Sequence, residues 1–145
     1  MNIKNYISTV AFETSVNRIE KNLVKAGANN ILKTYDDNQI LKGIQFTKEL
    51  NGTTISFKVE AKTDKIYQLL MKEFTRPTEI SKKNSLNQAE RTAWKLISDW
   101  VEIQLSLIAL DQADFMQIFL PYVFNLNTGK TFYSTIKESE FKLLK

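Results

Sequence analysis

Histidine and cysteine are both absent from this chain of 145 residues. Without histidine, the protein lacks the usual general base near neutral pH, the Ser-His-Asp and Cys-His catalytic arrangements, and the usual zinc sites. Without cysteine, it has no disulfides, thiolate metal sites or cysteine nucleophiles, which fits a reducing cytoplasm. An enzyme would have to work with carboxylates, lysine, tyrosine or arginine. These absences therefore favour a non-enzymatic protein.

Glycine and long apolar runs are also scarce. The chain has only four glycines and no glycine-rich loop that could cradle a phosphate. No group of carboxylates has the spacing of a metal-binding loop, so we expect neither a metal nor a cofactor. No apolar run approaches 18 residues, and the N-terminal "MNIKNYISTVAFE" lacks the apolar core of a signal peptide. We therefore expect a cytoplasmic protein that does not enter a membrane.

The composition that remains is that of an ordered globular protein. Hydrophobic residues make up 43% of the chain and charged residues 25%, and 145 residues fit a single domain over positions 1–145. The formal net charge of +4 is mild. It permits weak attraction to nucleic acid or to an acidic partner, but it is not the footprint of a dedicated nucleic-acid-binding protein.

The first half of the chain favours a helix followed by a three-stranded meander. Residues 6–12 alternate weakly and indicate a short strand, and residues 16–24 then show helical spacing up to Gly27. The period changes to two in "NNILKTY", "NQILKGIQFTKEL" and "TTISFKVEA". Asn51-Gly52 between the last two is a strong hairpin signal, because both residues tolerate positive φ. In the third strand, Ile55, Phe57 and Val59 should face the core.

The second half favours helices and a closing hairpin. A helix is predicted over residues 64–75, then a polar loop "TEISKKNS" that carries Lys82 and Lys83, then a long helix over about residues 86–110. Asp111 can cap a short helix, a hairpin follows around Asn127-Thr128-Gly129, and the tail forms a last helical turn. The predicted fold class is α+β: a small antiparallel sheet, made of the meander and the C-terminal hairpin, with a long central helix and shorter helices packed on one face.

A helical wheel divides the long helix into two sides. Trp100 lies well inside a wide apolar arc and is expected in the core, whereas Trp94 lies near its edge, where it could be core, subunit interface or ligand platform. Ser98 and Glu102 fall on the polar side. An apolar arc of roughly 200° suits a central helix, or one that also meets a second subunit in a homodimer.

Two polar residues lie inside the apolar arc. Glu90 could complete a capping box with Asn87 near the helix start, and Gln104 could bind a buried backbone edge. The alternative places both residues in a recessed polar pocket beside Arg91.

Basic residues gather near the start of the long helix. Arg91 and Lys95 are like charges four residues apart, and such an unrelieved basic pair suggests an anion or an acidic partner nearby. The basic residues of this region, together with neighbouring aromatic residues, have the composition of a surface that binds single-stranded nucleic acid. A lysine-rich solvated surface would have the same composition. The residues of this cluster are Arg76, Lys82, Lys83, Arg91 and Lys95, with Tyr67, Phe74 and Trp94.

The chain resembles a group of small, functionally uncharacterised phage and prophage proteins. The resemblance covers most of the chain, including "AGANNILKTYDDNQILKGIQF" in its first half. The matching residues of the second half are Gln88-Ala89, Arg91, Ala93-Trp94-Lys95, Asp99-Trp100-Val101, Gln104, Phe119-Leu120-Pro121-Tyr122, Gly129-Lys130-Thr131 and Tyr133. The resemblance implies a phage or mobile-element protein inside an infected bacterium. It carries over no catalytic residue.

Three hypotheses follow for the function. The first is a non-enzymatic binding protein that inhibits or modulates a host machine, such as a nuclease-based defence system. The second is a single-stranded nucleic-acid-binding protein, and the third is a small-nucleotide binder. The predicted partner is a host or phage protein, including a nucleic-acid-processing complex, with nucleic acid itself or a second copy as further partners. The predicted contact residues are Lys82, Lys83, Glu90, Arg91, Trp94, Lys95 and Gln104.

Overall fold

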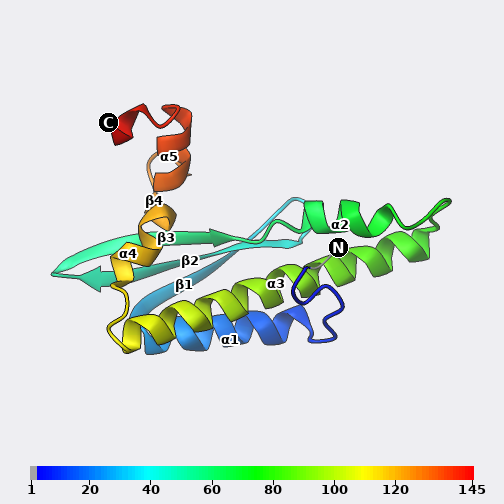
Figure 1. The fold of residues 1–145 in the computed structure, drawn as a ribbon, viewed down its shortest axis with the longest axis horizontal. Helices are drawn as coiled ribbons and strands as arrows, with labels where there is room; N and C mark the ends of the chain where they lie inside the picture. The colour runs from blue at the N-terminus through cyan, green and yellow to red at the C-terminus, as the bar shows by residue number, and fades with distance from the viewer. Residues whose placement is uncertain (1–2) are drawn as a thin grey trace. The chain divides into compact units, whose positions relative to one another are not determined.

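The computed structural model describes residues 3–145, and its contacts divide the chain into two compact units. The first unit contains Met1–Asn22 and Ala61–Ile103, and the second contains Leu23–Glu60 and Gln104–Lys145. Helices α1 (Phe12–Lys25) and α3 (Glu79–Ala109) contribute residues to both units. The α+β fold class is confirmed (Figure 1). A single domain over positions 1–145 stays a prediction.

A three-stranded antiparallel meander lies in the second unit, as predicted. Its strands β1 (Ala28–Tyr35), β2 (Leu41–Leu50) and β3 (Thr53–Glu60) lie in that order. Asn51 and Gly52 form the β2–β3 turn with φ of 52° and 82°. This pair of positive φ angles is the requirement of a two-residue type I′ hairpin, so the predicted turn is confirmed.

One face of the sheet forms an aromatic core in the second unit. Phe46 of β2 and Phe57 of β3 are opposite each other in the register and stack with ring centroids 5.0 Å apart. Helix α4 (Phe115–Phe119) adds Phe115 and Phe119, whose rings meet Phe57 edge-on at 5.5 and 6.3 Å. Phe57 and Val59 are buried, which confirms the predicted alternation in the second half of β3, whereas Ile55 is only half-buried.

The C-terminal part of the second unit differs from its prediction in two places. Asp114, and not Asp111, caps α4, because the Asp114 carboxylate accepts from Met116 N while Gln117 returns a bond to Asp114 N. The predicted hairpin is present as β4 (Phe124–Asn125) and β5 (Lys130–Thr131). It is short because Thr131 caps helix α5 (Phe132–Glu138) by accepting from Ser134 N. The 3-10 helices η1 (Leu120–Tyr122) and η2 (Lys142–Leu144) complete this part.

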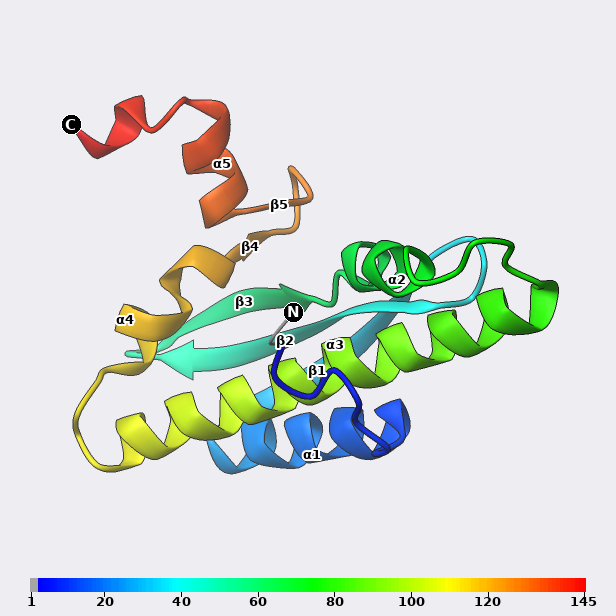
Figure 2. The same cartoon turned by 45° about the vertical axis from the view of Figure 1, so that its right-hand side comes forward.

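Helices make up the first unit. Within it, α1 runs beside α3 (Figures 1 and 2), and α2 (Thr63–Met71) precedes α3 in the chain. Helix α3 starts seven residues before its predicted start, because the Thr78 hydroxyl accepts from Ser81 N at 3.1 Å and caps the helix there. Lys82 and Lys83 therefore lie on the first turns of α3, and the prediction of a loop at these residues is wrong.

The two tryptophans of α3 reverse the expected order of burial. Trp94 has no exposed surface, whereas Trp100 is only half-buried. Ser98 was expected on the polar side but is fully buried, whereas the apolar residue Ile103 of the same helix is 55% exposed. The buried side of α3 is thus rotated toward its polar residues, and contacts with the N-terminal segment are the cause.

Candidate functional site

Residues 3–10, here called the N-terminal hook, bind the polar side of α3 within the first unit. The Gln88 amide donates to the carbonyl oxygens of Tyr6 and Ser8 at 3.0 and 3.1 Å, and the buried Thr92 hydroxyl donates to that of Asn5 at 3.1 Å. The hook turns sharply at Asn5, whose φ is 64°. The predicted strand over residues 6–12 is therefore wrong, because the backbone carbonyls at its start bind side chains of α3 instead of another strand.

Asp99 anchors the start of the hook. Its carboxylate accepts from the Asn5 amide at 2.9 Å and from Lys95 at 2.6 Å, with Lys4 at 3.8 Å. Burial of Asp99 disfavours the charged form and raises its pKa, but the hydrogen bonds from Lys95 and Asn5 and the nearby positive charges outweigh this effect. The net result is a pKa below the ordinary value of 3.8.

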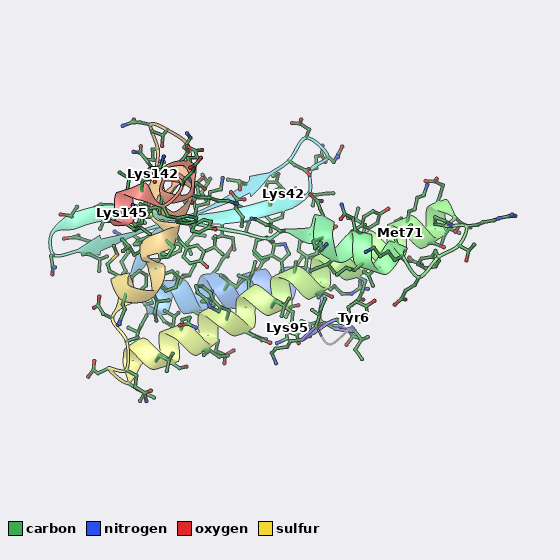
Figure 3. All side chains as sticks on the ribbon, turned by 45° about the horizontal axis from the view of Figure 1, so that its top comes forward. Tyr6, Lys42, Met71, Lys95, Lys142 and Lys145 are labelled. Atoms are coloured by element: carbon green, nitrogen blue, oxygen red, sulfur yellow. The ribbon has the colours of Figure 1, made fainter. Side chains whose placement is uncertain are left out.

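Tyr6 ties the hook to the segment that follows α2. Its hydroxyl donates to Glu73 Oε1 at 3.1 Å. Desolvation raises the pKa of Tyr6 above 10.0, and the hydrogen bond and the negative charge of Glu73 act in the same direction. Figure 3 shows Tyr6 and Lys95 near each other on one side of α3.

Arg91 and Lys95 have partners within the chain. The Arg91 guanidinium donates to Gln88 Oε1 at 2.6 and 3.1 Å, and Lys95 forms an i,i+4 ion pair with Asp99. The interpretation of these two residues as an unrelieved basic pair is wrong. The acidic group beside Lys95 is Asp99 of the same helix, one turn further along, and not an external partner.

Trp94 offers no ring surface to a ligand in this structure. The side chain has no solvent-exposed area, and its Nε1–H has no hydrogen-bond partner among residues 3–145. The indole is therefore core, which is one of the three expected alternatives. Stacking on a base would require the first unit to open.

Glu90 and Gln104 belong to different units. Glu90 is 9% exposed and lies well inside α3, so a capping box with Asn87 is wrong, because the helix already begins at Glu79. Glu90 has an interaction partner in the structure. Gln104 is half-buried in the second unit. A binding role for either residue stays a prediction.

The turn between α2 and α3 carries exposed basic and apolar side chains. Phe74 is 42% exposed and Ile80 is 74% exposed. Lys82 and Lys83 are exposed beside them, and Lys82 pairs with Glu79 at 3.3 Å. We call Lys72, Phe74, Arg76, Ile80, Lys82 and Lys83 the basic tip. The sequence indicated Lys82, Lys83, Arg76 and Phe74, but not Lys72 or Ile80.

A second group of exposed side chains belongs to residues 120–144 of the second unit, the segment that contains α5 (Figure 2 shows its ribbon). Tyr133 is 50% exposed, whereas Phe124 is half-buried with Lys58 Nζ 5.1 Å from its ring centroid. We call the large apolar residues exposed in this part the C-terminal apolar surface. They are Leu120, Leu126, Phe132, Tyr133, Phe141, Leu143 and Leu144.

Acidic residues form no metal-binding group in the described part of the chain. Over the same residues, no helix has the combined length and apolarity needed to cross a bilayer. Comparisons with protein-family models, with curated proteins and with solved structures give no match. The two exposed surfaces are therefore the candidate binding sites of this chain.

Proposed function

We propose that this chain is a non-enzymatic binding protein that docks on another protein through its C-terminal apolar surface. One observation carries the proposal. Of 15 large hydrophobic side chains exposed in the described part of the chain, seven fall within residues 120–144. An even distribution along 145 residues would place about three there. Exposed apolar side chains that gather in one part of a protein are typical of protein interaction sites.

The residue types also suit an interface. Phe132, Tyr133 and Phe141 are aromatic, and aromatic residues are enriched in interface cores and among the residues that dominate binding energy. Some of the neighbouring charges are paired locally, because Lys130 pairs with Glu138 at 2.7 Å and Lys142 with Glu140 at 3.8 Å. Removing the remaining exposed area of each aromatic or leucine side chain from water would contribute about 1 kcal/mol.

The partner that we propose is a host machine in an infected bacterium, such as a nuclease-based defence complex. This step rests on the resemblance to phage and prophage proteins and on a chain whose chemistry favours binding over catalysis. The protein would act by occupying a surface that the host complex needs. A second copy of the chain is the alternative occupant of the same surface.

The test compares three immobilised proteins as baits in bacterial lysate: wild type, the double variant Tyr133→Ser/Phe141→Ser, and Ile7→Ser as the matched control. Ile7 is 84% exposed in the first unit, far along the chain from the C-terminal apolar surface. Wild type and Ile7→Ser should retain the same protein, and the double variant should lose it. Retention by all three baits would contradict the proposal. Sedimentation of the purified protein separates a second copy from a foreign partner.

A further inference from the structure

The basic tip carries positive charge that the rest of the chain does not neutralise. Lys72, Arg76 and Lys83 are exposed, and no carboxylate among residues 3–145 pairs with them. The two acidic residues of the same segment are already engaged: Glu73 accepts from Tyr6, and Glu79 pairs with Lys82. Three unpaired cations thus remain within 12 residues of chain, which attracts an anionic partner.

Apolar groups lie among these cations. Phe74 stands between Lys72 and Arg76 in the sequence and exposes 42% of its surface, and Ile80 exposes 74%. Figure 3 shows the chain beyond Met71 leading into this turn, with side chains directed outward from α2 and α3. An exposed ring flanked in the sequence by cations supplies the two kinds of group that bind single-stranded nucleic acid: phosphates meet the cations and a base stacks on the ring.

We propose that the basic tip is a binding site for single-stranded nucleic acid. Lys72, Arg76 and Lys83 contact phosphates, Phe74 stacks on a base, and Ile80 contacts the neighbouring sugar or base. The site differs from the one first expected from the sequence, because Trp94 is buried and Arg91 and Lys95 have partners within the first unit. An acidic polypeptide could meet the same cations, but it would make no use of the aromatic ring.

The charges set the expected salt dependence. For single strands, the logarithm of the binding constant falls with the logarithm of salt concentration with a slope of about −0.7 for each phosphate contacted. Three contacts give a slope of about −2, and a fourth from Lys82, if it leaves Glu79, gives about −3. Affinity should therefore fall about 20- to 50-fold between 50 and 200 mM salt.

The experiment measures the fluorescence anisotropy of a labelled 30-nucleotide single-stranded DNA at several salt concentrations. The full chain is compared with the triple variant Lys72→Gln/Arg76→Gln/Lys83→Gln and with Phe74→Ala. The matched control, Lys21→Gln/Lys25→Gln/Lys62→Gln, removes the same charge from exposed residues outside the basic tip. Thermal unfolding confirms that every variant is folded.

Wild type and the control should bind with the steep salt dependence above. The triple variant should lose the binding, and Phe74→Ala should weaken it about tenfold. Equal loss in the control and in the triple variant would overturn the site, and absence of binding at 50 mM salt would overturn the activity. Equal affinity for poly-glutamate or for anionic phospholipid vesicles would show a general anion surface and overturn the assignment to nucleic acid. None of these outcomes depends on the C-terminal apolar surface, so this inference and the proposed function can fail separately.

Discussion

Removal of the Gln88 side chain should release the N-terminal hook. In the variant Gln88→Ala, the carbonyls of Tyr6 and Ser8 lose their hydrogen bonds of 3.0 and 3.1 Å, and Arg91 loses its acceptor. Each neutral hydrogen bond contributes about 0.5–1.5 kcal/mol net. The half-buried Arg91 recovers part of its loss by binding water. The free energy of unfolding should fall by about 2 kcal/mol, which lowers the melting temperature by roughly 6 °C in a chain of this size.

Urea unfolding followed by circular dichroism measures this change, and hydrogen exchange locates it. Exchange should quicken at residues 3–10 without a matching change in the β2–β3 hairpin. Gln68→Ala is the matched control, because Gln68 is an exposed glutamine on α2 and the same gain in helix propensity applies to it.

The Thr92→Val variant tests whether Gln88 and Thr92 bind the hook cooperatively. The Thr92 hydroxyl donates to Asn5 O at 3.1 Å and to Tyr6 O at 3.3 Å, so it acts on the same turn as Gln88. Once either side chain is removed, the other should contribute less, and the double variant should be more stable than additivity predicts by at least about 0.5 kcal/mol.

For the Gln88→Ala prediction, equal stability of Gln88→Ala and Gln68→Ala, with unchanged hydrogen exchange at residues 3–10, would refute the reasoning.

Three further predictions concern single positions. Asp99→Asn should destabilise the protein at pH 7, and its stability should converge with that of wild type as the pH falls below 3.8. The reason is that a carboxyl whose pKa is lowered by folding stabilises the native state above its unfolded pKa and loses that contribution as it is protonated. Urea unfolding midpoints at several pH values would show this convergence. Gly52→Val should cost about 1–2 kcal/mol, because φ is 82° although the site has free space, and an unchanged unfolding midpoint would contradict the assigned turn. Trp94→Phe should shift tryptophan emission to longer wavelength, because only the half-buried Trp100 remains, and should leave DNA binding unchanged; a loss of binding would return Trp94 to the site.

Local features of the fold were predictable because their causes are local. Asn51 and Gly52 favour positive φ wherever they occur, so the sequence alone located the β2–β3 turn. The alternation of Phe57 and Val59 follows from the period of a strand, and both are buried. The start of α3 was also a local signal, since Thr78 is a good cap. It was missed because the polar residues after it resembled a loop.

The polar side of α3 was not predictable, because its partners are distant in the sequence. Gln88 binds Tyr6 across 82 positions, and Asn5 binds Asp99 across 94. A helical wheel ranks residues by type and therefore assigned Lys95 and Ser98 to solvent. The N-terminal hook supplies hydrogen-bond partners for Gln88, Thr92 and Asp99 there, so polar side chains are buried without a large penalty.

The hydrogen bonds between the N-terminal hook and α3 also determine where the binding of a partner would be favourable. A ligand at the polar side of α3 would have to replace hydrogen bonds that the hook already makes, and an exchange of like bonds gives little affinity. A ligand at the C-terminal apolar surface displaces only water from side chains such as Phe141, which is 49% exposed. Substitutions at the two places should therefore differ in their effect on capture. Gln88→Ala should lower stability and leave partner capture intact, whereas Tyr133→Ser/Phe141→Ser should abolish capture. Because about half of each ring is already buried in the folded chain, the double variant should also lose about 1 kcal/mol of stability per ring.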